Sequence, residues 1–491
     1  MFEVTRPFLF FEYFRIPNRT QGPPHKWNDR LPERHPFRRA CGMFHWEGDQ
    51  SSCRTAYWID GSLSPTPLHR LPLQEYRIDS FPIYGRIIPD HLSIEWLSTS
   101  GGTWHRAEAV CDRKGTRIAS IWREEEGSIF IPFDPAEIIK NFWTEAYKSV
   151  LSKPITRSLN RFALRSYYRF IRPALPRRTQ ILFRQRLSQL QGTTRFPRWP
   201  VETALQDFYA LVFSWITAIA GVPVPMLSPW PRGYSWALAL THDVETSLGW
   251  QNIGAVRDLE TELGYRSSWN LVPGMFSLEP TLIASLIDGG FEVGVHGLYH
   301  DGRDLESLAM LKERLPAIRQ SAEAWGATGF RSPSTHRVWE WMPLLGFDYD
   351  SSYPDTDPFE PQPGGCCSLL PYFNDNLIEL PITLPQDHTL FFILNHKDEA
   401  LWVDKAQYIK EQNGMALLIG HPDYLVAGTS MQAYRTLLRG LSSDPTMWRA
   451  LPRDISGWWR RRAASHLEGR GDHWEVVGPA ADEAAIHFTK V

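Results

Sequence analysis

Two carboxylates stand at the end of a short apolar run near the middle of the chain. The run "WALAL" (236–240) predicts a buried strand, and it leads directly into "THDVE" (241–245). Residues two apart on a strand face the same side, so Asp243 and Glu245 point together while His242 points away. Adjacent carboxylates repel each other unless a cation or a shared proton relieves them. The pair therefore indicates a cation site or, in a plainer interpretation, a solvated turn that caps the next helix.

A pair of histidines follows a second apolar strand. The run "FEVGV" (291–295) ends at His296, and His300 follows four residues later. If the chain turns helical at His296, this spacing places both imidazoles on one face, close enough to share a metal ion. A single histidine is more typical of a satisfied core or surface residue. Together with Asp243 and Glu245, the pair favours a hydrolytic metal site.

Three further polar residues stand at predicted strand ends. Arg331 in "GFRSPS" could keep a carboxylate ionised through a bidentate hydrogen bond, or it could be an ordinary loop arginine. His421 in "LLIGHPDY" could be a general acid facing a pocket, or a histidine that caps a turn. Asp350 in "FDYDSSYP" could orient an imidazole or a sugar hydroxyl. Asp348 shares its face on strand spacing, and we prefer Asp350 because it is nearer the strand exit.

The elements that must position these residues follow Pro231. Short apolar runs alternate there with stretches suited to helices, such as 279–288 and 304–325. This alternation predicts an α/β fold with a parallel sheet, either open or closed into a barrel. Folds of this class place their ligand sites at the carboxyl ends of the strands. We therefore expect the polar residues above to meet at one edge of the sheet.

The ordered set of motifs resembles the NodB-type polysaccharide deacetylases, a family of carbohydrate esterases. That family has an aspartate at a first strand end, then His-x-x-x-His, Arg-x-Pro, a second aspartate at a strand end, and a late Leu-x-x-His strand. All five motifs occur here in this order, between about 234 and 441. The stretches "IPFDPAE" and "YYRFIRPALPRR" are similar to a subgroup with an additional N-terminal domain. The resemblance implies a distorted (β/α)7 barrel and a divalent metal, usually zinc.

The resemblance also implies a role for each matching residue. Asp243 matches the base that takes a proton from a metal-activated water, and Arg331 matches the residue that tethers this base. His421 matches the general acid, and Asp350 matches the aspartate of the fourth motif. The implied metal ligands are Glu245, His296 and His300.

One motif departs from the family pattern. The family usually has two adjacent aspartates at the first strand end, whereas this sequence has Asp243-Val244-Glu245. A glutamate is one methylene longer, which would displace the ion by on the order of 1 Å unless the backbone compensates. The departure leaves the identity of the metal, and its occupancy, open.

The implied activity is a metal-dependent hydrolase that removes N-acetyl groups from an amino sugar or a polysaccharide precursor. We expect the oxyanion to be stabilised by the metal and by a backbone N–H near Tyr353. Two alternatives stay open. One is a catalytically silent deacetylase-like protein that binds glycan or scaffolds a complex at a membrane surface. The other is a hydrolase of a non-sugar C–N bond.

The composition of the 491 residues excludes several classes of protein. Lys and Arg number 52 and Asp and Glu 55, so the net charge of −3 gives no reason to expect a nucleic-acid partner. No apolar run approaches the ~18 residues of a membrane span, and the first fifteen residues lack a secretory pattern. Five cysteines are too few and too irregular for a disulfide framework or a zinc ribbon. We expect a cytoplasmic protein.

One segment is strongly basic. Residues 146–201 hold thirteen Lys or Arg and no Asp or Glu, which leaves 39 − 55 = −16 for the remainder. Arg157, Arg161, Arg165 and Arg169 recur every four residues, on one face of a predicted helix. They could pair with acidic faces of neighbouring domains. Alternatively, segment 148–198 could contact anionic lipid, at ~1 kcal/mol per basic residue.

The length predicts two or three domains, and the changes in composition suggest where they divide. We expect an N-terminal α/β or α+β domain (1–145), a basic helical connector (146–232), the deacetylase-like barrel (233–442), and a C-terminal extension that packs on the barrel (443–491).

Overall fold

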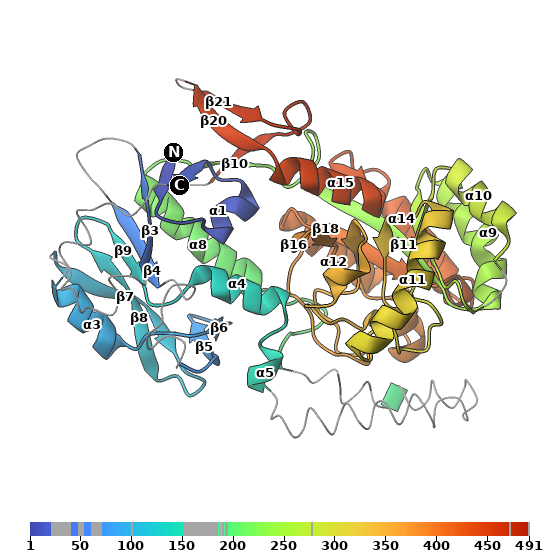
Figure 1. The fold of residues 1–491 in the computed structure, drawn as a ribbon, viewed down its shortest axis with the longest axis horizontal. Helices are drawn as coiled ribbons and strands as arrows, with labels where there is room; N and C mark the ends of the chain where they lie inside the picture. Colours follow the sequence, from blue (N-terminus) through green and yellow to red (C-terminus); the bar gives the residue numbers. More distant parts are fainter. Residues whose placement is uncertain are drawn as a thin grey trace. The chain divides into compact units, whose positions relative to one another are not determined.

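The structure is a computed structural model, and it describes residues 1–20, 41–47, 54–59, 71–99, 102–151, 185–186, 188, 191, 195–275, 278–470 and 473–489. These residues form two compact units (Figure 1). The first unit contains Met1–Lys153, Thr203–Ser228 and Arg461–Val491. The second contains Pro154–Glu202 and Pro229–Arg460.

The two units divide the chain at other points than the four predicted segments. Helix α8 (Ala204–Ala220) comes from the predicted connector, and strand β22 (Ile486–Phe488) comes from the predicted C-terminal extension, yet both belong to the first unit. Apolar residues recur every three or four positions along α8, and this face packs against strands of the first unit. The predicted basic helix around 157–172 lies outside the described residues.

The first unit is built on a nine-stranded sheet in which most neighbouring strands are antiparallel. In the spatial order β2-β1-β3-β4-β9-β8-β7-β5-β6, its strands are β2 (Asn18–Thr20), β1 (Phe2–Val4), β3 (Cys41–Trp46), β4 (Thr55–Ile59), β9 (Ile129–Ile131), β8 (Arg117–Glu124), β7 (Trp104–Cys111), β5 (Gln74–Ile78) and β6 (Phe81–Gly85). The other helices of this unit are α1 (Leu9–Phe14), α3 (Asp90–Thr99), α4 (Pro135–Trp143) and α5 (Lys148–Leu151). Two small sheets pair β10 (Pro225–Leu227) with β22 and β20 (His466–Arg470) with β21 (His473–Val477).

Seven parallel strands form the centre of the second unit. They pair in the order β17-β15-β14-β13-β12-β11-β18, with β16 antiparallel to β17 and β19 parallel to β11. Their bounds are β11 (Trp236–Val244), β12 (Ser267–Leu271), β13 (Glu292–Val295), β14 (Gly329–Phe330), β15 (Tyr349–Asp350), β16 (Tyr372–Asn374), β17 (Leu377–Glu379), β18 (Met415–Gly420) and β19 (Met447–Arg449). Strand β11 is buried along its whole length, as its continuous apolar sequence predicts for a parallel strand covered on both faces.

Helices alternate with these strands. They are α9 (Ser247–Glu262), α10 (Pro280–Asp288), α11 (Leu308–Trp325), α12 (Ala400–Glu411), α13 (Pro422–Leu425), α14 (Ser430–Leu441) and α15 (Pro452–Ala463), together with short helical turns at Pro333–Thr335, Met342–Leu345 and His388–Ile393. Local sequence sets the helix ends. The hydroxyl of Thr246 accepts a hydrogen bond from the Gly249 amide at the start of α9 (3.0 Å), and Ser307 does the same for Met310 at the start of α11 (3.1 Å).

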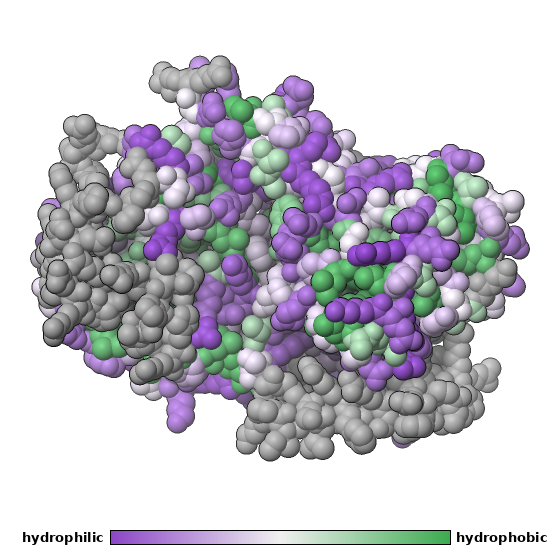
Figure 2. Space-filling view, in the orientation of Figure 1, coloured by the Kyte–Doolittle hydropathy of each residue, from purple (hydrophilic) through white to green (hydrophobic). Residues whose placement is uncertain are grey.

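The predicted α/β class and parallel sheet of the second unit are confirmed, because the strands form one curled sheet with helices between them. Its closure into a seven-stranded barrel stays a prediction. Among the coloured residues of the face shown in Figure 2, polar side chains (purple) and apolar side chains (green) are interspersed. No helix in the described part of the chain is both long and apolar enough to cross a membrane.

Candidate functional site

The carboxyl ends of the parallel strands surround a small cavity in the second unit. Its volume is about 60 Å³, which is room for about four to six waters or one small acyl group. The residues that line it are Asp243, Glu245, His300, Ser334, Thr335, Glu360, Gln386, His388, His421 and Tyr424. Four predicted site residues line the cavity, namely Asp243, Glu245, His300 and His421. His296 and Arg331 do not line it, but each lies close to Asp243. The chain therefore brings together six of the seven predicted residues.

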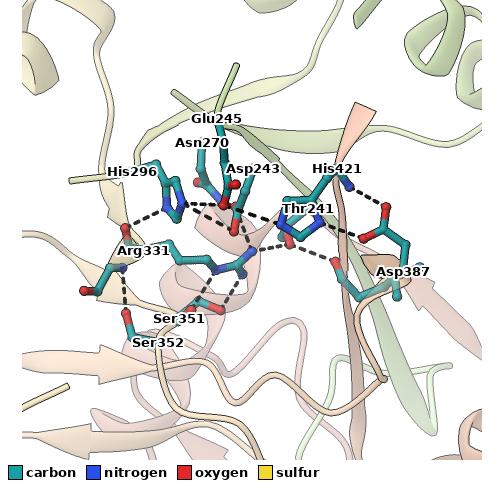
Figure 3. A network of polar contacts seen from close by, with 12 residues as sticks. Thr241, Asp243, Glu245, Asn270, His296, Arg331, Ser351, Ser352, Asp387 and His421 are labelled. Atoms are coloured by element: carbon teal, nitrogen blue, oxygen red, sulfur yellow. Dashed lines mark hydrogen bonds and ion pairs between the residues drawn. The ribbon is translucent and has the colours of Figure 1, made fainter. Parts of the chain in front are cut away.

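Asp243 lies at the end of β11, beside a polar residue of the neighbouring strand. In the parallel register it faces Asn270 of β12, whose amide nitrogen donates a hydrogen bond to Oδ1 of Asp243 (2.8 Å; Figure 3). Nη1 of Arg331 donates to the same oxygen (3.1 Å). Burial alone would raise the pKa of Asp243, but the charge of Arg331, helped by His296, holds it below its usual value. Asp243 is therefore ionised at neutral pH.

Arg331 is fixed on all sides by buried partners. Its Nε donates to the Ser351 carbonyl and its Nη2 to the Ser351 hydroxyl (both 2.7 Å), and its Nη1 also donates to Oγ1 of Thr241 (2.8 Å). Only Nη1 reaches Asp243, so the bidentate hydrogen bond that we predicted for this pair is wrong. The fork of the guanidinium is occupied by Ser351 instead, which orients the one nitrogen that reaches the carboxylate.

The two histidines lie close together without a helix. His296 follows β13, and the chain then turns through a loop in which His300 has a left-handed backbone (φ 51°). Their ring centroids are 5.2 Å apart. Gly297 makes this turn possible, since its φ is 65° and a Cβ there would lie 2.3 Å from a carboxylate oxygen of Asp304. The helical turn at His296 on which this spacing argument depended does not form, because the backbone is left-handed at Gly297 and His300.

Glu245, His296 and His300, here called the His–Glu cluster, offer three ligand atoms within 4.8 Å of one another. Oε1 of Glu245 lies 2.8 Å from Nε2 of His300, 3.5 Å from Nε2 of His296 and 3.6 Å from Nε2 of His421. The longer glutamate thus carries its carboxylate into the space between three imidazoles. Burial opposes its ionisation, but the charge of His300, 2.8 Å away, holds the pKa of Glu245 well below its usual range.

The donor set of the His–Glu cluster fits a metal ion. Two imidazoles and a carboxylate are a common donor set for zinc. Nδ1 of His296 lies 3.0 Å from the Arg331 carbonyl, which assigns the proton to Nδ1 and leaves a lone pair on Nε2. That Nε2 is buried and makes no hydrogen bond of regular geometry within the described residues. An imidazole so oriented is ready to bind a cation.

His421 lies at the start of α13, directly after β18. Its side chain makes no capping hydrogen bond, so the plainer interpretation of this residue is wrong. Instead Nδ1 lies 2.6 Å from Oδ1 of Asp387, whose other oxygen accepts the His421 amide (2.7 Å). Burial would lower the pKa of His421, but the charge and hydrogen bond of Asp387 raise it well above its usual value. A protonated His421 faces the cavity.

Asp350 is the predicted site residue that the structure does not bring to the cavity. It is fully buried in β15, where Oδ1 accepts a hydrogen bond from the Ser352 hydroxyl (2.8 Å). Burial raises the pKa of Asp350, and burial together with the charge of Asp350 raises the pKa of Glu379. The group that orients an imidazole is Asp387 instead. The alternative Asp348 is exposed.

The predicted oxyanion donor near Tyr353 is not available. The amides of Ser352 and Tyr353 donate to Oε1 of Glu379 (3.1 and 2.9 Å), so the N–H near Tyr353 is already engaged and the predicted oxyanion donor is wrong.

Sequence analysis also missed Asn270 and Asp387. A signal existed for Asn270, since it ends the strand "SSWNL" next to β11. No motif marks Asp387, which reaches His421 only through the packing of the chain.

No protein-family model and no curated protein matches this chain. Similar solved structures include a protein of Mycobacterium smegmatis provisionally described as a polysaccharide deacetylase (19% identity, TM-score 0.41, 50% of this chain and 96% of that one). Puue allantoinase is also similar (18%, 0.40, 48% and 93%), as is a protein of Pseudomonas aeruginosa PAO1 provisionally described as a polysaccharide deacetylase (18%, 0.40, 48% and 94%). Two of these structures are described as polysaccharide deacetylases, the family that the sequence motifs resemble.

Proposed function

We propose that this chain is a metal-dependent hydrolase that removes N-acetyl groups from an amino sugar or a polysaccharide precursor. The observation that carries the proposal is a convergence at one cavity. The His–Glu cluster, the Asp243–Arg331 pair and the His421–Asp387 pair come from strand ends and loops far apart in the sequence. A cation site, a base and an acid are the groups that hydrolysis of an amide requires.

The His–Glu cluster would hold the cation. A bound divalent ion such as zinc would polarise the acetyl carbonyl and lower the pKa of a water molecule at the site.

Asp243 and His421 carry the proton transfers in this proposal. Oδ1 of Asp243 is engaged by Asn270 and Arg331, which leaves Oδ2 to accept a proton from the attacking water. Nδ1 of His421 is held by Asp387, so Nε2 faces the cavity and hands its proton to the departing nitrogen. The water oxygen adds to the acyl carbon to give a tetrahedral intermediate. The C–N bond then breaks as the nitrogen takes the proton of His421, and the products are acetate and a free amine.

The test is acetate release from chito-oligomers and nucleotide-linked N-acetylhexosamines, measured with the full chain before and after dialysis against zinc. We expect release that depends on the added metal, together with about one bound zinc per chain by elemental analysis. A chain that stays metal-free after dialysis and releases no acetate would instead be a catalytically silent glycan-binding protein. Turnover restricted to small cyclic amides would identify a hydrolase of a non-sugar C–N bond.

A further inference from the structure

Two consecutive residues of the cavity wall have a strained backbone. Ser334 and Thr335 follow the Arg331-Ser-Pro turn and line the cavity, with φ values of 53° and 50°. A left-handed conformation is rare for any residue with a side chain, and for a β-branched residue such as Thr335 it is an outlier. Backbone strain of this kind persists only where the surroundings enforce it, and it clusters at sites that bind ligands.

The surroundings of Thr335 do enforce its conformation. Its amide donates to the Ser332 carbonyl (3.0 Å), and its own carbonyl accepts from Nη1 of the buried Arg337 (2.9 Å). Its hydroxyl oxygen is buried and makes no hydrogen bond to any described residue. A buried hydroxyl without a partner is costly. A ligand in the cavity that Thr335 lines is the group available to satisfy it.

Glu360 reaches the same cavity from a second loop. Asp357 and Gly364 close this loop by exchanging backbone hydrogen bonds (2.7 and 2.9 Å). The ring of Phe359 packs edge-on against Trp199, with centroids 5.0 Å apart. Glu360 itself is only 6% exposed, so its carboxylate is held in the wall of the cavity.

The two loops are tied to each other. The amide of Arg337 donates to Oε1 of Gln362, and Nε2 of Gln362 donates back to the Arg337 carbonyl (both 3.1 Å). Since Arg337 also holds Thr335, this reciprocal pair fixes the loop of Thr335 relative to the loop of Glu360. The two side chains are therefore preorganised on one wall of the cavity.

We infer that Thr335 and Glu360 form a subsite that recognises a hydroxyl group of the substrate beside the acyl group. A carboxylate only accepts hydrogen bonds, whereas a threonine hydroxyl both donates and accepts. A substrate hydroxyl can donate to Glu360 and accept from Thr335. No lysine or arginine is among the described residues that line the cavity, and three carboxylates are, so outside the cation site this wall offers hydrogen-bond acceptors rather than partners for an anion. This inference rests on the proposed function and narrows its substrate to a neutral, hydroxylated amide, as in an amino sugar.

The first test compares chito-oligomers with analogues that each lack one hydroxyl near the acetamido group. We expect the unmodified protein to show a KM about tenfold higher for one of these analogues, the size of a hydrogen bond to a charged group. The variant E360Q should lose this discrimination, because its KM for the unmodified chito-oligomer rises about tenfold, to that of the analogue. Glu340→Gln, a change of the same type at an exposed residue nearby, is the matched control. If E360Q discriminates every analogue as well as the unmodified protein does, the inference is wrong.

The second test removes the hydroxyl of Thr335. Thr335→Val keeps the shape of the side chain and should raise KM about threefold to tenfold, the size of a neutral hydrogen bond. Thr335→Ser keeps the hydroxyl and should restore the KM of the unmodified protein. A role confined to packing would instead predict that valine is tolerated and that serine is not.

A binding measurement separates failure of this inference from failure of the proposed function. Titration calorimetry with chitotriose and its deoxy analogues is carried out on Asp243→Asn and on the double variant with Glu360→Gln. A difference in Kd of about tenfold that Glu360→Gln abolishes supports the subsite even if no acetate is released. Turnover without any such difference keeps the proposed function and overturns the subsite. A chain that binds none of these sugars overturns it as well.

Discussion

Strand β11 separates two polar clusters of opposite character. On one face, His242 stacks on Trp269, with ring centroids 4.4 Å apart, and its Nε2 lies 2.6 Å from Oε1 of Glu260. The same carboxylate accepts hydrogen bonds from Tyr434 and Ser267 (both 2.6 Å). On the other face, Asp243 leads to the His–Glu cluster, where the nitrogen and oxygen atoms face one another around a cavity.

Histidine and glutamate occur in both clusters. On one face of β11 they hydrogen-bond to each other in the core, and on the other they offer ligand atoms beside a cavity. Glu260 is fully buried and both of its oxygens have donors, so its carboxylate is closed to a ligand, although Nδ1 of His242 beside it makes no hydrogen bond to a described residue. In the His–Glu cluster, the buried Nε2 of His296 has no hydrogen bond of regular geometry within the described residues. Buried polar groups are normally satisfied. The exception at His296 points to a ligand because two further ligand atoms lie within 4.8 Å of it, beside a cavity. The predictions below test this contrast, from the largest expected effect to the smallest.

Replacement of His296 by Ala should disrupt the His–Glu cluster and leave the cluster around Glu260 intact. We expect acetate release to fall by on the order of 10⁴-fold, about 5 kcal/mol, because a ligand atom of the cation site is lost. Zinc content should fall with it, while the circular dichroism spectrum stays that of the folded protein. Unchanged turnover in this variant would show that the site lies elsewhere.

Replacement of Glu260 by Ala should disrupt the cluster around Glu260 and destabilise the fold. His242, Tyr434 and Ser267 would lose their buried acceptor, and we expect unfolding free energy to fall by about 4 kcal/mol. Urea denaturation followed by tryptophan fluorescence measures the change. Glu262→Ala, an exposed change on the same helix, is the matched control. A loss of activity without a loss of stability would mean that this cluster also belongs to the site.

The buried carboxyl group of Glu292 allows a test by pH of a carboxyl group that is hydrogen-bonded within the protein. Glu292 accepts hydrogen bonds from the Tyr349 hydroxyl and the Arg453 amide (2.8 and 3.1 Å), and burial raises its pKa to about 7. A raised pKa means that its contribution to stability is full below its usual pKa of 4.5 and is lost as the pH rises through about 7.

Glu292→Gln should therefore match the unmodified protein near pH 4 and exceed its stability by about 3 kcal/mol near pH 8. Denaturation midpoints at both pH values decide the outcome. Equal differences at the two pH values would contradict the raised pKa.

Replacement of Asp387 by Asn should give the smallest of these effects. The side-chain oxygen that faces Nδ1 of His421 is kept, but the negative charge that favours the protonated imidazole is removed. We expect kcat to fall about 10²-fold with little change in KM or in zinc content. A change in KM alone would assign Asp387 to substrate binding rather than to the orientation of His421.

Local sequence established the strand ends and therefore most of the site. Continuous apolar runs followed by polar residues identified β11, β13 and β18, and a parallel sheet places such ends at one edge by its geometry. This is why Asp243, Glu245, His296, His300 and His421 could be selected before any coordinates. The helices at 280–288 and 308–325 were also predictable, since their apolar periodicity and caps are local.

Tertiary packing decided the partners of those residues. Asp387 reaches His421 across 34 residues, and Thr335 and Glu360 share a wall only because Arg337 and Gln362 join their loops. Asp350 has strand-end spacing like that of Asp243, yet its side chain is buried in β15 and hydrogen-bonded to Ser352 instead of lining the cavity. Spacing along a chain specifies which face a side chain takes. Which group it meets depends on contacts between distant segments, and these exist only once the sheet has formed.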